Sequence, residues 1–226
     1  MITTTESLKR NRPSAVTTGS TGLDSVDYRK QFRTLYAGSE KRVEVVHAPR
    51  MNYLAIDGIG HPADIAGFSE AADALCRVSL EARIEVSRAE VMEFAVMPLE
   101  CIWWNEDPDV VANGDPRWTL MVMQPVISPS VLLEAVERLK STGDGARILD
   151  QIRLVKFYEG PAAQTLTRSP ELMPQDARDR LQQFIAVNGY RAHGSLHEIF
   201  LDGLCIPPAR KASRLLRQPV ASLHER

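Results

Sequence analysis

The chain has 226 residues, of which 44% are hydrophobic, and this is enough for a sizeable buried core in one large domain or two small ones. Its 27 basic and 29 acidic side chains give a net charge of −2, so no positive field would hold a polyanion, and direct binding of nucleic acid is not expected. No apolar run approaches the roughly 18 residues of a membrane span, and no apolar block follows the Thr-rich start, so we expect a cytoplasmic protein without membrane contact.

Cysteine and histidine patterns give no sign of a metal site. Cys76, Cys101 and Cys205 are odd in number and widely spaced, as is typical of free thiols in a reducing compartment. The pair His197-Glu198 begins like a zinc-protease helix, but Leu201 stands where the second histidine would be needed. We therefore expect neither a metal nor an organic cofactor.

The first part of the chain reads as a tail followed by one α+β unit. Residues 1–27 are rich in Ser, Thr and Gly without apolar periodicity, and a flexible tail is predicted. A short helix from Tyr28 to Gly38 is predicted to dock on the domain formed by residues 28–226. The first half of that domain, about residues 41–125, contains patterns for strands at 43–45 and 53–56, a helix at 67–83, and strands at 92–104 and 118–124.

The second part of the chain repeats this order. Ser128-Pro129 opens a crossover helix that ends before Gly143. The second half, about residues 150–220, contains patterns for strands at 152–158 and 162–167, a helix at 174–188 and a strand at 196–201. The segments 99–102 and 197–200 each place a glutamate on a late strand. We infer two pseudo-equivalent α+β halves.

Trp103 and Trp104 are adjacent at a strand end, which is the least expected feature of the sequence. Strand alternation sends their rings to opposite faces unless the backbone bends. One ring then lines a cavity, or both serve as core or rim packing. The strand aromatics Tyr53 and Tyr158 pack in the core by default, and belong to a pocket only if one of the tryptophans does.

Glu198 lies among apolar neighbours, and alternation puts it on one face with Leu196 and Phe200. If that face lines a cavity, the carboxylate could act as a general base, orient a water, or neutralise a cationic ligand. Otherwise it is an exposed glutamate on an edge strand. Glu100 is its counterpart in the first half, with the same two interpretations.

Six ordered segments over most of the chain resemble the GyrI-like small-molecule-binding family. They are Tyr28–Tyr36 (YRKQFRTLY), Met51–Pro62 (MNYLAIDGIGHP), Val96–Trp104 (VMPLECIWW), Trp118–Pro125 (WTLMVMQP), His197–Leu201 (HEIFL) and Leu216–Val220 (LRQPV). The resemblance implies an α+β fold with two SH2-like βαββ units, related by a pseudo-twofold axis, that form a central ligand cleft. It also implies a pocket with aromatic walls and a glutamate, at Trp103, Trp104 and Glu198, with Glu100 in the paired segment.

The Trp-Trp pair is similar to the aromatic cage of a hydrolytic subfamily, the cyclopropanoid cyclopropyl hydrolases. This resemblance implies a cofactor-independent hydrolase that opens the cyclopropane ring of planar DNA alkylators of the yatakemycin and CC-1065 type, giving self-resistance or detoxification. Glu198 is the expected catalytic residue, and Tyr158 or Tyr53 could donate a hydrogen bond to the oxygen that gains charge. The expected substrate-binding residues are Trp103, Trp104, Glu100, Tyr53, Tyr158 and Phe200.

Two alternatives remain open at this point. The same pocket could bind or sequester hydrophobic, often cationic, drugs without reaction. The family name also suggests an interaction with DNA gyrase, for which the tail and the acidic loop Asn105–Asp115 would be candidate contacts.

Overall fold

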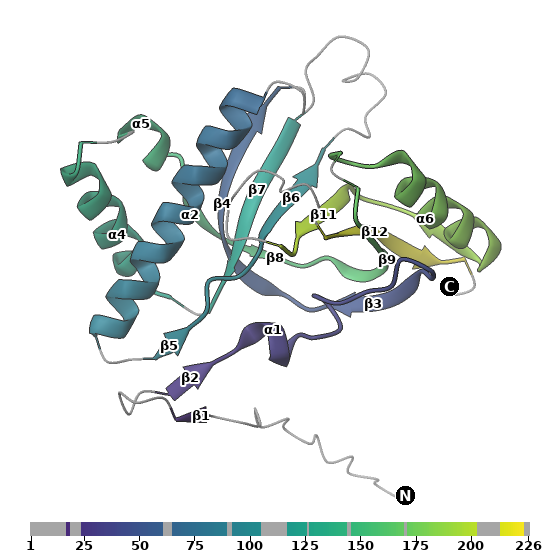
Figure 1. Ribbon diagram of the computed structural model, residues 1–226, viewed down its shortest axis with the longest axis horizontal. Helices are drawn as coiled ribbons and strands as arrows, with labels where there is room; N and C mark the ends of the chain where they lie inside the picture. The colour runs from purple at the N-terminus through teal and green to yellow at the C-terminus, as the bar shows by residue number, and fades with distance from the viewer. Residues whose placement is uncertain are drawn as a thin grey trace, which may run out of the picture.

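The computed structural model describes residues 17–18, 24–60, 65–89, 92–104, 117–125, 127–143, 146–169, 171–202 and 213–223. The structure combines helices with a large antiparallel sheet, which confirms the α+β class (Figure 1). The elements are β1 (Thr17–Thr18), β2 (Asp24–Val26), α1 (Tyr28–Gln31), β3 (Glu44–Ala48), β4 (Met51–Ile59), α2 (Ile65–Arg88), β5 (Glu93–Phe94), β6 (Leu99–Trp103), β7 (Arg117–Gln124), α4 (Pro129–Ser141), α5 (Ala146–Leu149), β8 (Arg153–Phe157), β9 (Gly160–Thr167), α6 (Gln175–Val187), β10 (Tyr190–Ala192), β11 (Leu196–Phe200) and β12 (Arg214–Ser222). Most of the expected tail and the acidic loop lie outside the described residues.

The main sheet is built from two βαββ units in pseudo-twofold arrangement. Its strand order is β3-β9-β12-β11-β6-β7-β4-β8, with β10 added to β12, and the pairs are antiparallel. The first unit is β4-α2-β6-β7 and the second is β9-α6-β11-β12. The units meet where β6 pairs with β11, so the pseudo-twofold axis passes between these two strands.

The two units exchange their leading strands. β3 comes just before β4 in the chain but pairs with β9 of the second unit. β8 comes just before β9 but pairs with β4 of the first unit. Each unit therefore borrows its outermost strand from the other.

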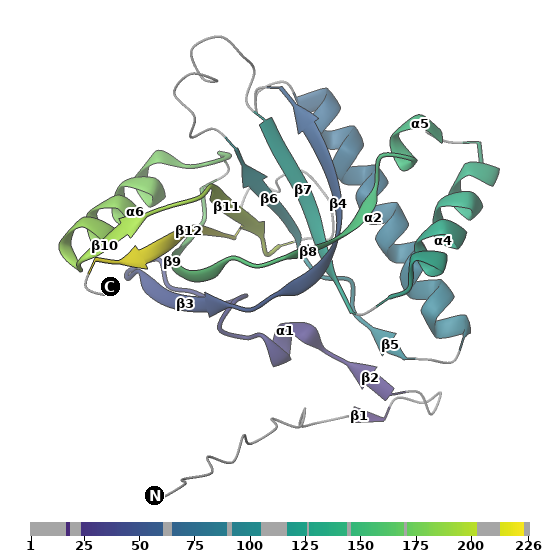
Figure 2. The same ribbon diagram turned by 180° about the vertical axis from the view of Figure 1, so that it is seen from behind.

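The central sheet has two different faces, which the register of β6 and β11 defines. Trp103 pairs with Leu196 and Cys101 pairs with Glu198, so these four side chains share one face. This face, called the helical face below, is covered by α2 at one end and α6 at the other (Figures 1 and 2). The opposite face carries Glu100 and is covered by the segment that follows α1.

The helices form where the apolar residues recur at helical spacing. In α2 the side chains of Leu75, Val78 and Ala82 follow at three- and four-residue intervals and are fully buried. In α4 the Oγ atom of Ser128 accepts a hydrogen bond from the N–H of Val131, as expected of an N-cap. The predicted Ser-Pro start of this helix is confirmed.

One local prediction is wrong. α1 has only four residues instead of continuing to Gly38, although Leu35 and Tyr36 beyond its end are buried against the sheet. A helix this short gains little from its own hydrogen bonds, and tertiary contacts hold the rest of the segment. The expected tail also contains ordered pairing, because β2 joins β1 and β5 in a separate small sheet.

The cysteines differ from one another in the fold. Cys101 is a free thiol, and burial raises its pKa. Cys76 on α2 is disulfide-bonded, so the prediction of free thiols is wrong for this residue. Distance along the sequence does not determine which residues approach one another in the fold. Among the described residues, none of the helices has both the length and the hydrophobicity to cross a lipid bilayer.

Candidate functional site

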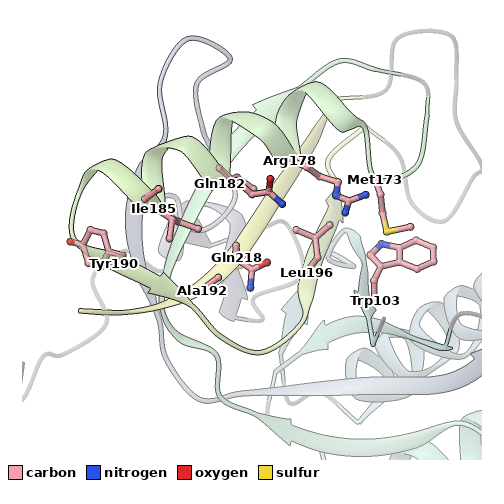
Figure 3. Close-up of a pocket in the computed structure, with 11 residues that line it drawn as sticks. Trp103, Met173, Arg178, Gln182, Ile185, Tyr190, Ala192, Leu196 and Gln218 are labelled. Carbon is pink, nitrogen blue, oxygen red and sulfur yellow. The ribbon is translucent and has the colours of Figure 1, made fainter. Parts of the chain in front are cut away.

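A cavity of about 450 Å³ lies between α6 and the helical face of the sheet (Figure 3). Its walls come from β6, β10, β11, β12, α6 and the turn before α6. The lining residues are mostly apolar or aromatic, with a few polar side chains: Trp103, Met173, Arg178, Leu181, Gln182, Ile185, Ala186, Tyr190, Ala192, Leu196 and Gln218. This composition is typical of a site for a small organic ligand.

Trp103 forms one end of the cavity and is fixed in place by its neighbours. Its ring stacks on Phe68 of α2, with centroids 5.8 Å apart and planes 4° apart. Phe68 in turn meets Trp118 edge-on at 5.2 Å. The indole Nε1 donates a hydrogen bond of 3.2 Å to Oε2 of Glu198. The tryptophan is therefore a rigid wall, linked directly to the predicted catalytic carboxylate.

Glu198 is completely buried behind this wall. Its Oε2 also accepts a hydrogen bond of 3.2 Å from the N–H of Met173, and its Oε1 accepts one of 3.1 Å from Arg214. Burial raises the pKa of Glu198, while the charge of Arg214 and the three hydrogen bonds act in the opposite direction. Two of the three donors, Trp103 and Met173, line the cavity.

Met173 closes the turn between β9 and α6 in an unusual conformation. Its φ of 47° is the one positive φ of a non-glycine residue in the described chain. Such a backbone persists where surrounding interactions hold it, and the hydrogen bond to Glu198 is one of them. The turn thereby holds the backbone of Met173 between Glu198 and the cavity.

Arg214 on β12 completes the surroundings of Glu198. Both side chains of this ion pair are fully buried. The guanidinium also lies 5.3 Å from the ring centroid of Phe200 and donates to the carbonyl of Glu171. Phe200 thus contacts Arg214, the ion-pair partner of Glu198, and is not among the residues that line the cavity.

On the opposite face, Glu100 belongs to a separate buried network. Its Oε1 accepts a hydrogen bond of 2.7 Å from the hydroxyl of Tyr36, and its Oε2 lies 2.9 Å from Nε2 of His197. Tyr53 is buried on this face as well and hydrogen-bonds to Glu100. Burial, and then the negative charge of Glu100, raise the pKa of Tyr53 well above its ordinary value.

His197 connects Glu100 to a second buried carboxylate. Its Nδ1 lies 3.0 Å from Glu159, which also accepts a hydrogen bond of 2.9 Å from Arg217. Burial would lower the pKa of His197, but the charge of Glu159 and hydrogen bonds to Glu159 and Glu100 raise it to about 9. Burial would raise the pKa of Glu159, but the charges of His197 and Arg217 lower it to about 2. His197 and Glu159 are therefore both charged at neutral pH.

Trp104 and Tyr158 lie away from both the cavity and the buried network around Glu100. Trp104 is 48% exposed, and its Nε1 donates to Thr119, which donates to Asp57, beside a second cavity of about 870 Å³. Tyr158 is 53% exposed and lies beside the ring of His47. The two tryptophans are thus on opposite faces, as alternation predicts.

The predicted site residues therefore divide into groups. Trp103 and Glu198 meet at the cavity, with Phe200 next to the arginine behind them. Glu100 and Tyr53 belong to the network on the opposite face. Sequence reasoning missed Met173, Arg178, Tyr190 and Arg214. The repeated glutamate motif could have indicated Arg214, because a buried carboxylate such as that of Glu198 requires a cationic partner.

Within the described ranges no group of His, Cys, Asp and Glu side chains could hold a metal ion. His197 instead contacts the carboxylates of Glu100 and Glu159.

Solved structures provide the comparison with known proteins. An uncharacterized conserved protein from Listeria innocua is 27% identical over 87% of this chain and 100% of that chain, with a TM-score of 0.74. A hydrolase from Listeria innocua is 26% identical over 88% of this chain and 100% of that one, with a TM-score of 0.72. No protein-family model matches the chain, and no curated protein does.

A more distant similarity indicates the fold alone. The C-terminal domain of EcmrR is 10% identical over 80% of this chain and 98% of its own length, with a TM-score of 0.51. Together with the topology of two βαββ units, these similarities define a GyrI-like fold. The fold predicted from the resemblance is confirmed.

Proposed function

We propose that this chain is a hydrolase that opens the cyclopropane ring of planar DNA-alkylating compounds of the yatakemycin and CC-1065 type. The observation that carries the proposal is the hydrogen bond between Glu198 and Trp103, which couples a buried carboxylate to the aromatic wall of a ligand-sized cavity. The similarity to a hydrolase from Listeria innocua over that protein's full length supports the same class of activity.

In the proposed reaction, the flat ligand packs against Trp103 and a water molecule lies between the ligand and Glu198. The water oxygen forms a bond to the cyclopropane CH₂ carbon, and a carbon–carbon bond of the ring breaks. The electron pair moves through the cyclohexadienone to its oxygen, which becomes a phenolate. Glu198 takes the proton from the water and returns it to the phenolate, so the net change is the addition of one water.

The site must open before this chemistry can occur. Glu198 has no exposed surface and its oxygens are occupied by Trp103, Met173 and Arg214. Movement of Met173 would remove one of the two hydrogen bonds to Oε2, leaving the one from Trp103, and would release the left-handed backbone of the turn. Hydrolysis would destroy the electrophile and thereby protect DNA, which is the proposed biological role.

The test is turnover of a cyclopropane-bearing alkylator, followed as a mass gain of one water by chromatography and mass spectrometry. Glu198→Gln should reduce kcat by about 10²–10⁴, the usual contribution of a general base. Glu159→Gln is a matched control, because it also removes the charge of a buried glutamate paired with an arginine of β12, but outside the cavity. Equal turnover in both variants would contradict the role of Glu198, and ligand binding without conversion would leave a drug-sequestering protein.

A further inference from the structure

The cavity contains the positive charge of Arg178, which takes no part in the reaction steps described above. Arg178 extends from α6 into the cavity, and Figure 3 shows its guanidinium directed toward the end that Trp103 and Met173 form. In the part of the chain that the structure describes, this guanidinium has neither a hydrogen bond nor an ion pair. Arg180, two residues further on, is bound instead to Asp176 and to the carbonyl of Leu166.

The charge of Arg178 is not cancelled by the walls of the cavity. The described lining contains no aspartate and no glutamate. Glu198 lies behind the wall, but Arg214 already forms an ion pair with it. Arg178 is therefore the one charged side chain among the described residues that line the cavity. In a partly buried site such a charge favours an anionic or strongly polarised oxygen and disfavours a cation.

The tyrosines expected to assist the reaction are not available there. Tyr53 is buried on the opposite face and bonded to Glu100, and Tyr158 lies on the surface. Tyr190 does line the cavity, but Figure 3 shows it at the far end from Trp103. Arg178 is the cation on the Trp103 side.

We propose that Arg178 binds the ligand oxygen that becomes negative, and that the cavity therefore selects planar ligands with a carbonyl or anionic oxygen over planar cations. The catalytic part of this inference rests on the proposed function. A guanidinium can donate two parallel hydrogen bonds to such an oxygen or to a carboxylate. In the ring-opening step it would stabilise the phenolate as the carbon–carbon bond breaks.

Two planar probes of the same size test the charge preference without any reaction. They are naphthalene-2-carboxylate and naphthalen-2-ylmethylammonium, titrated into the full chain by calorimetry. The wild type should bind the carboxylate at least tenfold more tightly, Arg178→Met should lose this preference, and Arg178→Lys should retain part of it. Arg147→Met, on the exposed surface of α5, is the control for loss of one positive charge.

A second measurement separates this inference from the proposed function. With a cyclopropane-bearing alkylator, Arg178→Met should lower kcat by about 10²–10³, the usual effect of removing one donor to a developing oxyanion. If the wild type opens no cyclopropane but prefers the carboxylate probe, the proposed hydrolysis fails and the ligand preference stands. Weak or absent binding of the carboxylate by the wild type, or an unchanged preference in Arg178→Met, would overturn the inference.

Discussion

His197 should make the protein less stable as the pH rises from 6.5 to 9. Its pKa is 6.5 in an ordinary environment and about 9 in the folded protein. Between these values the folded protein holds a proton that the unfolded chain has released. The free energy of unfolding therefore falls with increasing pH, and the contribution of His197 is complete below pH 6.5 and lost above pH 9.

The size of this effect follows from the difference between the two pKa values, about 2.5 pH units. At about 1.4 kcal/mol for each unit, the imidazolium contributes roughly 3–4 kcal/mol to stability. The same ion pair also lowers the pKa of Glu159. Its energy is therefore not added a second time for Glu159. Replacement by glutamine keeps a side chain that can donate a hydrogen bond, but removes the titration.

Urea unfolding followed by circular dichroism at pH 6.5, 7.5 and 9 would measure the effect. The wild type should lose roughly 3 kcal/mol across this range. His197→Gln should be less stable at pH 6.5 and should show little further loss. His193→Gln is the control, since His193 is exposed. A parallel loss of stability in the wild type and in His197→Gln would refute the assignment of a buried imidazolium.

Two further substitutions test the packing behind Glu198 and around Trp118. Arg214→Met leaves the buried charge of Glu198 without its ion-pair partner. In urea titrations it should lower the free energy of unfolding by about 3–5 kcal/mol. A loss under about 1 kcal/mol would show that the ion pair is not needed for stability. Gly58→Ala would place a Cβ 2.0 Å from the ring of Trp118. We therefore expect about 1–3 kcal/mol of destabilisation and an altered near-ultraviolet circular dichroism spectrum. An unchanged spectrum would contradict the close approach of Gly58 to Trp118.

Strand alternation predicted more of the site than any single motif did. It placed Glu198 on the same face as Leu196, and it separated Trp103 from Trp104, and both placements agree with the register of β6 and β11. Alternation depends only on local backbone geometry, so it can be read from a few consecutive residues. It could not show that Trp104 faces a different cavity, because this depends on which elements cover each face.

β12 was the main strand that the hydrophobic pattern did not predict. Arg214, Arg217 and Pro219 interrupt the apolar residues, and such a segment resembles an exposed loop. In the fold both arginines are buried, because each meets a buried glutamate from elsewhere in the chain. Pro219 pairs with Ala162 inside the sheet. These partners come from long-range contacts, which local periodicity does not contain.

Arg178 was missed for a related reason. On a helix with many charged residues, an arginine is expected to face water. Arg180 pairs with Asp176 four residues earlier on the same helix, whereas only the position of α6 over the sheet turns Arg178 toward the cavity. The directions of side chains on a helix become informative once the neighbouring elements are known.

The exchange of β3 and β8 between the two units has a consequence for assembly of the chain. Glu44 pairs with Gln164, which is 164 − 44 = 120 positions further along the chain, so the β3 edge of the sheet can form only after that length of chain has been synthesised. A fragment with only the first half of the chain, about residues 41–125, would have β3 without β9 and β6 without β11. We expect such a fragment to pair with a second copy of itself, reproducing as a dimer what the intact chain achieves within one molecule.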